Sequence, residues 1–167
     1  MTTLNSPLEL GVRALVLLTA AYPASVTLDK ITVMDHYLLH SGDLDGPESI
    51  APALSTRGGE TSVKRSVLEH GLQLMVRAGL VDLRPAADGL RFQASESAAP
   101  FLQLIRSSYI GQLREVAGWV VSVTALLAPE NVRTELTKIA GQWALEVQAD
   151  GATDELKAGV VREVSAS

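Results

Sequence analysis

The 167-residue sequence contains no cysteine and only three histidines, and aromatic residues make up 4% of it. The absence of cysteine excludes disulfides, thiolate metal sites and thiol nucleophiles. The longest apolar run near the N-terminus, residues 14–22, is far shorter than the roughly 20 residues that span a bilayer. Residues 1–22 also lack the basic start and the small-residue cleavage site of a signal peptide. We therefore expect a soluble cytoplasmic protein without membrane contact.

Charged residues are scarce as well, at 20%, whereas hydrophobic residues make up 47%. A small domain with this ratio exposes apolar surface, which favours an obligate partner or an oligomer. The formal net charge is −5, and only residues 51–91 are net positive, with six basic and four acidic side chains. Dedicated nucleic-acid-binding proteins usually carry a stronger basic stripe, so this pattern is a weak indication of DNA binding.

Capping residues and apolar spacing predict three helices in the first half of the chain. Ser6 and Pro7 begin the first, which runs to about Ala21 and is apolar on more than one face, as a central buried helix would be. Thr27 caps the second, which ends near His40. The third spans about residues 62–79. Between the last two, residues 41–61 contain glycine and proline without clear periodicity, which predicts a long functional or partner-docked loop.

Residues 80–84 and 90–94 alternate as two strands around a turn at residues 85–89. Three helices followed by a hairpin is the order of a winged-helix domain. The predicted fold class is therefore mainly α (α+β), with a winged-helix domain over residues 1–95 that includes the loop 41–61. A C-terminal helical extension, residues 96–148, is expected to pack on it, and residues 149–167 to form a flexible tail.

Two histidines four residues apart, His36 and His40, have the spacing with which helices bind zinc. With Asp43 or Asp45 as a third ligand they would form a metal site, and His36, His40 and Asp43 would be the centre of an enzyme. The helix end near His40 and the missing cysteines favour a structural role in the loop for His40, Asp43, Asp45 and Arg57. In that interpretation His40 and Asp43 are hydrogen-bonded, and the chain has no catalytic residue, metal or cofactor.

Basic residues on the third helix and the hairpin are candidate nucleic-acid contacts, because these elements meet DNA in DNA-binding winged helices. The candidates are Lys64, Arg65, Arg77, Arg84 and Arg91. A solvated or protein-facing surface is the alternative, since Glu69 lies on the same exposed stripe and would repel a backbone phosphate.

The C-terminal helices carry more apolar residues than one packing face requires. On the helix predicted over residues 108–127, one stripe contains Leu113, Val116 and Val120, and a second contains Trp119, Val123 and Leu126. A further helix begins near Pro129 and includes Trp143. These stripes belong either to the domain core or to a partner or dimer interface. The interface candidates are Trp119, Val123, Leu126 and Trp143.

Several segments together resemble a known family: LNSPLELGVRALVLLTAAYP, DHYLLHSGDLDGPESIAP, RGGETSVKRSVLEHGLQLMVRAGLVD, and DGLRFQASESAAPFL with REVAGWV. They are similar to the middle components of bacterial ABC three-component systems, over roughly residues 4–143. The HSGDLDGP segment is the most specific of them, because a generic winged-helix regulator would not need it.

This resemblance implies a non-catalytic subunit that docks on an SMC/Rad50-like ABC ATPase in an anti-phage or anti-plasmid defence complex, as in the Lamassu systems. The subunit would couple the sensing of foreign DNA to a separate effector, with DNA contacted directly or through the complex. The alternative function is a homodimeric winged-helix transcription regulator that binds DNA itself.

Overall fold

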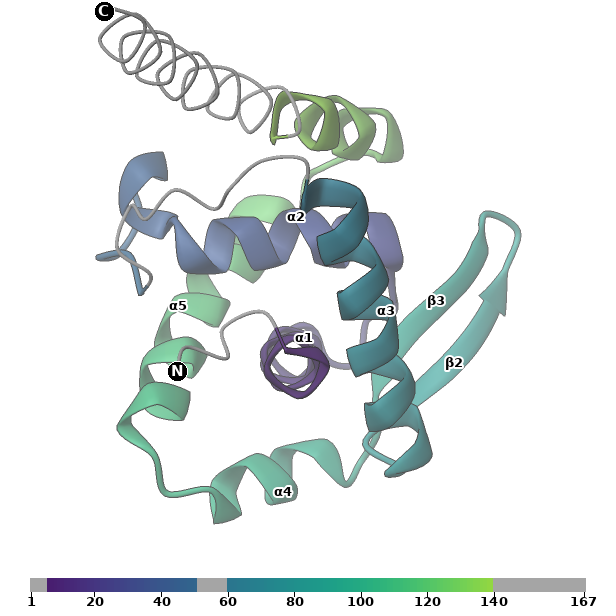
Figure 1. Cartoon of the computed structure of the whole chain (residues 1–167), viewed down its shortest axis with the longest axis vertical. Helices are drawn as coiled ribbons and strands as arrows, with labels where there is room; N and C mark the ends of the chain where they lie inside the picture. The colour runs from purple at the N-terminus through teal and green to yellow at the C-terminus, as the bar shows by residue number, and fades with distance from the viewer. Residues whose placement is uncertain (1–5, 51–59, 140–167) are drawn as a thin grey trace, which may run out of the picture.

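The computed structural model describes residues 6–50 and 60–139, with side chains in the second range from Arg65 onward. Figure 1 looks down the central helix, with the other long helices arranged around it. The elements in chain order are α1 (Pro7–Ala21), β1 (Val26–Thr27), α2 (Leu28–Leu39), the 3-10 helix η1 (Ser41–Leu44), α3 (Glu60–Arg77), β2 (Val81–Ala86), β3 (Gly89–Ala94), α4 (Ala98–Leu104) and α5 (Ser108–Thr124). Residues 129–139 are also helical. This mainly α fold with a small β element confirms the predicted class.

Short polar side chains fix where the first two helices begin. The Ser6 hydroxyl accepts a hydrogen bond from the Glu9 amide at 3.1 Å, and the Thr27 hydroxyl accepts one from the Lys30 amide at 3.3 Å. Both predicted caps are thus confirmed. Gly79 has a φ of 76° just after α3, a backbone conformation that favours glycine. α3 begins at Glu60, two residues before its predicted start, and the region predicted as a loop contains η1.

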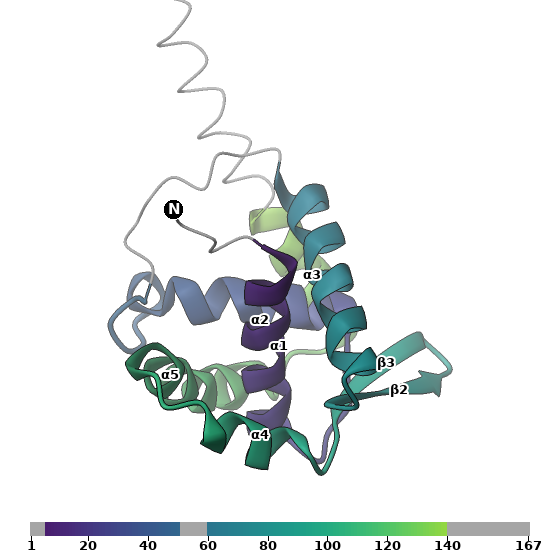
Figure 2. The ribbon, with the colours of Figure 1, turned by 60° about the horizontal axis from the view of Figure 1, so that its bottom comes forward.

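The sheet has three antiparallel strands in the order β1-β3-β2, with Phe92 of β3 opposite Val26 on one side and Leu83 on the other. The sequence analysis missed β1, because a two-residue strand is too short to show alternation. It also placed Pro85 in the turn, whereas this proline lies in β2. β2 is an edge strand, where a residue without an amide proton is tolerated. The β2–β3 hairpin projects away from the helices (Figure 2).

The core is built around α1. Residues 13–18 of α1 are all buried, so its middle is covered on every side, as predicted for a central helix, and its main packing partners are α3 and α5. Leu113, Ala117 and Val120 of α5 belong to the same apolar cluster as Leu10 and Leu15 of α1. The helices that follow the hairpin therefore share one continuous core with those that precede it. None of the helices in the described part of the chain is long and apolar enough to cross a membrane.

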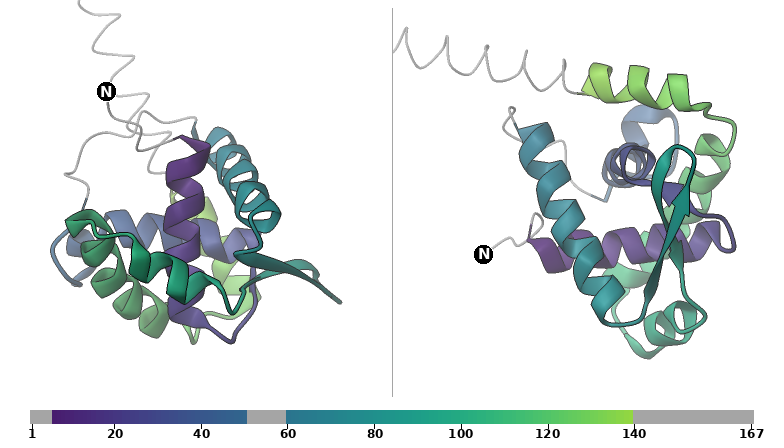
Figure 3. Two further views of the ribbon diagram at one scale, coloured as in Figure 1. Left: turned by 90° about the horizontal axis from the view of Figure 1, so that it is seen from below. Right: turned by 90° about the vertical axis from the view of Figure 1, so that its right-hand side faces the viewer.

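A second, smaller cluster joins residues 129–139 to α2, as Figure 3 shows. Val132 and Ile139 pack on Val33. The Tyr37 hydroxyl donates a hydrogen bond of 2.9 Å to the Glu135 carboxylate. Burial and this hydrogen bond together raise the pKa of Tyr37 to about 12, so the phenol stays protonated and remains a donor.

α1 and α3 approach each other most closely at Gly11 and Gly71. A Cβ atom on Gly11 would lie 2.7 Å from the Gly71 carbonyl oxygen, and a Cβ on Gly71 would lie 2.6 Å from the Gly11 nitrogen and closer still to the Pro7 carbonyl oxygen. These neighbours are backbone atoms that cannot rotate away. The two glycines therefore set the distance at which the α3–hairpin unit sits on α1.

Gly71→Ala is expected to lower the free energy of unfolding by about 1–3 kcal/mol, because the new methyl group must push the two helix backbones apart. Gly118→Ala is the matched control: Gly118 also lies inside a helix, but a Cβ atom added to it would meet nothing within 4 Å. There the change should stabilise by about 0.5–1 kcal/mol through backbone entropy. Urea unfolding of both variants tests this, and equal effects would contradict the close-contact account.

Candidate partner-binding and nucleic-acid-binding surfaces

One charged pair is fully buried in the core. Arg13 of α1 donates from Nε to Asp35 Oδ1 at 2.7 Å and from Nη2 to Asp35 Oδ2 at 3.1 Å, and both side chains are 0% exposed. Burial alone would lower the pKa of Arg13, but the adjacent Asp35 carboxylate more than offsets it and holds that pKa above its usual value. A guanidinium that stays protonated cannot exchange protons with a substrate, so this pair is a structural link between α1 and α2.

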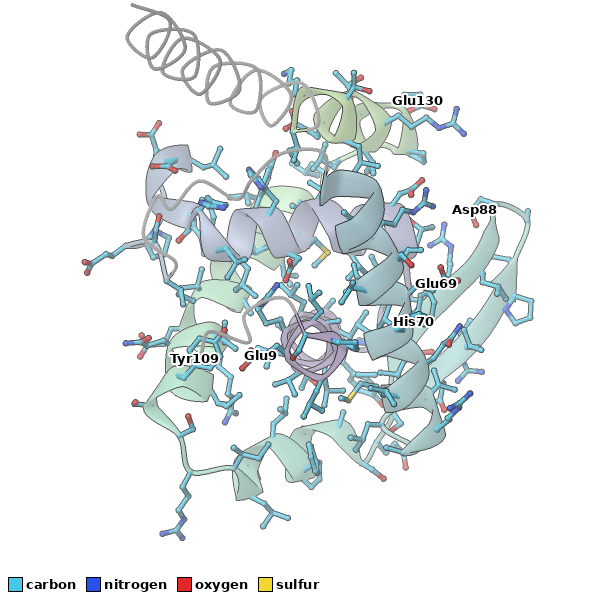
Figure 4. All side chains as sticks on the ribbon, in the orientation of Figure 1. Glu9, Glu69, His70, Asp88, Tyr109 and Glu130 are labelled. Atoms are coloured by element: carbon cyan, nitrogen blue, oxygen red, sulfur yellow. The ribbon has the colours of Figure 1, made fainter. Side chains whose placement is uncertain are left out.

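Tyr109 of α5 lies beside this buried pair. Burial raises the pKa of Tyr109, while the charge of Arg13 acts in the opposite direction. Figure 4 shows Tyr109 on α5 and Glu9 on α1 on the same side of the molecule. Tyr109 and Glu9 are both half-buried, but the Tyr109 hydroxyl and one carboxylate oxygen of Glu9 are buried.

The two histidines singled out in the sequence lie at the end of α2. His40 follows the last helical residue, and the ring centroids of His36 and His40 are 4.7 Å apart. His40 Nδ1 lies 4.0 Å from an oxygen of Asp43, an ion-pair distance that is longer than a hydrogen bond. Among the described residues, no three His, Asp or Glu side chains gather closely enough to hold a metal ion.

Residues 41–50, which we call the folded loop, close on themselves after α2. The Gly42 amide donates a hydrogen bond of 2.9 Å to the Ser49 hydroxyl, and the Gly46 amide donates one of 2.9 Å to the Ser41 carbonyl. Ser41 is buried, and Asp45 has a left-handed backbone with a φ of 59°. Arg57, predicted to belong to the same loop, lies outside the described residues.

Trp119 of α5 covers the folded loop. A Cβ atom on Gly46 would lie 2.6 Å from the Trp119 ring, so only a glycine lets the indole lie this close to the backbone. Trp119 is half-buried and also contacts the main core. Of the other interface candidates, Val123 and Leu126 are 43% and 93% exposed at the C-terminal end of α5. Trp143 lies outside the described residues.

The arginines predicted to contact nucleic acid mostly have acceptors within the chain. Arg65 pairs with Asp29 of α2 at 2.7 Å, and Arg91 forms two hydrogen bonds to Asp88, of 2.7 and 3.1 Å. Arg84 donates a hydrogen bond of 2.9 Å to Gln93. Arg77 is exposed at the end of α3, while Lys64 lies in α3 at a position whose side chain is not described. These pairings reduce the positive potential that the face would offer to a phosphate.

An apolar groove lies between the hairpin and α3. Cross-strand pairing places Leu83 opposite Phe92, and the inner end of this hairpin face is buried against the helices. Further out, Leu83 and Leu90 are 44% and 57% exposed. The groove has a volume of about 190 Å³, and its walls are Glu69, Gln73, Val76, Arg77, Leu83, Leu90 and Phe92. Figure 4 labels Glu69 on the side of α3 that faces the hairpin.

Comparison with protein families identifies the family of this chain. The model of the family described as ABC-three component (ABC-3C) system Middle Component 2 matches residues 3–146. The chain belongs to this family. No curated protein and no solved structure matches the chain. A middle component is an accessory part of a multi-component system, so this chain has partner subunits.

The match to this ABC-3C middle component family runs through α1, the folded loop, the hairpin and α5. It confirms the family that the HSGDLDGP segment indicated. In the structure that segment is the end of α2 followed by the folded loop under Trp119. The sequence analysis missed both the Arg13–Asp35 pair and the groove, which depend on residues brought together from distant parts of the chain.

Asp35→Ala is expected to lower the free energy of unfolding by about 3–5 kcal/mol, because it leaves the Arg13 guanidinium buried without its counter-ion. The double change Arg13→Met with Asp35→Leu should recover most of that loss, since no charge then remains to be solvated. Thermal and urea unfolding of both variants measure this. A single variant with wild-type stability would show that the pair is not buried as described.

Trp119→Ala is expected to loosen the folded loop without unfolding the domain. Exchange of the Gly42 and Gly46 amides should accelerate by roughly tenfold or more, which corresponds to about 1.4 kcal/mol of lost protection. Val123→Ala, an exposed position four residues further along α5, is the control and should leave those amides unchanged. Hydrogen exchange read by NMR resolves both, and unchanged exchange in Trp119→Ala would refute the docking of the loop on α5.

Proposed function

We propose that this middle component docks on an SMC/Rad50-like ABC ATPase in a bacterial anti-phage or anti-plasmid defence complex of the Lamassu kind. In that complex it is a non-catalytic subunit that couples DNA sensing to an effector. Membership of the ABC-3C family supports the existence of partner subunits. The groove between α3 and the hairpin is the observation that carries the choice of a protein partner.

The groove has the composition of a protein-binding surface. Leu83 and Leu90 extend the apolar face of the hairpin beyond the part that α3 covers. Two large aliphatic side chains left in water favour burial against another protein, since each contributes roughly 1.5–3 kcal/mol when fully buried. Arg77 and Glu69 at the margin provide the polar rim that such interfaces have.

The pairing of the arginines favours this function over a homodimeric transcription regulator. The helix order and the strand order β1-β3-β2 suit a winged helix, in which α3 and the hairpin meet DNA. Here Arg65 and Arg91 are held by Asp29 and Asp88, and the surface between α3 and the hairpin is apolar. We infer that α3 and the hairpin of this chain bind a protein partner instead of DNA.

Co-purification tests the proposal directly. The tagged chain is expressed with the other components of its system and washed in high salt, which removes phosphate-dependent contacts but leaves an apolar interface intact. The wild-type chain should retain the ATPase. The double variant Leu83→Asp with Leu90→Asp should retain at most roughly one tenth of that amount of ATPase.

The matched control for this experiment is Leu104→Asp, because Leu104 is 81% exposed at the far end of α4. It should retain the ATPase at the wild-type level. Loss of the ATPase by the control to the same extent would refute the assignment of the groove. Recovery of only a homodimer that releases DNA as salt rises would refute the accessory function and favour the regulator.

A further inference from the structure

A cleft of about 330 Å³ lies on a different part of the surface, where three segments from distant parts of the sequence meet. Residues 25–30 enter and begin α2, Asp88 and Arg91 come from the hairpin, and residues 127–133 lead into the last described helix. Figure 4 labels Asp88 and Glu130 on this side of the molecule. None of the predicted interface residues lies in the cleft, and Arg91 is the one predicted nucleic-acid contact among its described lining residues.

We propose that this cleft binds a phosphate group, with Lys30 and Arg133 as the cationic side chains that hold it and Arg91, which stays paired with Asp88, as a third positive charge at its border. All three line the cleft, and they come from α2, β3 and the helical residues 129–139. Convergence of cations from three separate elements creates a local positive site in a protein whose net charge is −5. The proposal goes beyond the docking function and does not depend on it.

The two carboxylates of the cleft are already occupied. Asp29 forms its ion pair with Arg65, at 2.7 Å, and Asp88 forms its ion pair with Arg91. Within the described residues, neither Lys30 nor Arg133 forms an ion pair with a carboxylate. The positive charge of these two side chains is therefore left for a ligand to neutralise.

The environment of Lys30 favours a bound anion. Partial burial lowers the pKa of Lys30, and the neighbouring positive charge of Arg91 lowers it further. An anion beside Lys30 would form a charge-assisted contact with its ammonium group and offset this repulsion. A phosphate suits the site better than a single carboxylate, because its oxygens can accept hydrogen bonds from several cations at once.

The backbone around the cleft also favours a bound anion. The first turn of α2 and the start of the helical residues 129–139 both border the cleft, and the N-terminal ends of helices favour negative charge. The Thr27 hydroxyl already accepts from the Lys30 amide, so the backbone contributes through its dipole, and the side chains supply the direct contacts. The phosphate can belong to a free nucleotide or to a nucleic-acid backbone, and these two sources are separated by experiment.

The full-length chain is titrated with inorganic phosphate, with ATP and with a short DNA duplex, and binding is followed by NMR shifts of the backbone amides. The proposal expects shifts at residues 25–30, 88–91 and 129–133 with at least one phosphate-bearing ligand. Lys30→Gln should lower the affinity for that ligand by roughly tenfold or more, the loss expected for a hydrogen bond to a charged group. Shifts with phosphate and ATP alone identify a free phosphate compound, and shifts with DNA that fade in salt identify the backbone.

The control is Lys138→Gln, since Lys138 is an exposed lysine near the end of the same helical stretch as Arg133 and does not line the cleft. It should change the dissociation constant by less than twofold. The proposal is overturned if no ligand shifts the cleft amides of the wild-type chain. It is also overturned if both lysine variants weaken binding equally while keeping the wild-type melting temperature.

Discussion

The buried ion pair between Arg13 and Asp35 is the interaction on which the arrangement of the surfaces depends. It ties α1, the helix at the centre of the core, to α2 through two hydrogen bonds in a place that water does not reach. Such a pair contributes little net stability relative to a well-packed apolar core, but it tolerates only one register between the two helices. On α1, the close contact of Gly11 with Gly71 fixes α3 in the same way. One central helix thus positions both α2, which borders the cleft, and α3, which borders the groove.

Each of those elements carries a different surface. α3 and the hairpin form the apolar groove, whereas the start of α2 and residues 129–139 border the cationic cleft. The end of α2 leads into the folded loop, which is held by Trp119. The groove and the cleft share no lining residue, so the docking and the phosphate binding proposed above do not compete for the same side chains. This division suits a subunit that connects a partner protein to a second signal.

The sequence predicted the parts of this structure that depend on neighbours along the chain. The caps at Ser6 and Thr27 and the glycine after α3 are local signals, and each was found where expected. The hairpin was also found, but β2 extends into the predicted turn and does not alternate in burial. The family, too, could be recognised from short segments. β1 was missed because it acquires strand character only by pairing with β3.

Long-range contacts could not be predicted in this way. Arg13 appears in the sequence as one charge in an apolar helix, and no local sequence pattern identifies Asp35 as its partner. The pattern showed Arg65 as a candidate nucleic-acid contact, because the Asp29 that holds it comes from another helix. The spacing placed Trp119 on a second apolar stripe, but the glycine that it covers is far away in the chain. Charge and apolar surface can be counted from a sequence, whereas their pairing requires the fold.

The central claim is that the hairpin and α3 meet a protein rather than DNA. Hydrogen exchange, measured by mass spectrometry on the chain alone and mixed with the ATPase of its system in high salt, tests it most directly. The account predicts added protection in residues 69–94 when the ATPase is present, with residues 98–104 unchanged. Protection of residues 69–94 by DNA alone, lost as salt rises, with no effect of the ATPase, would contradict it.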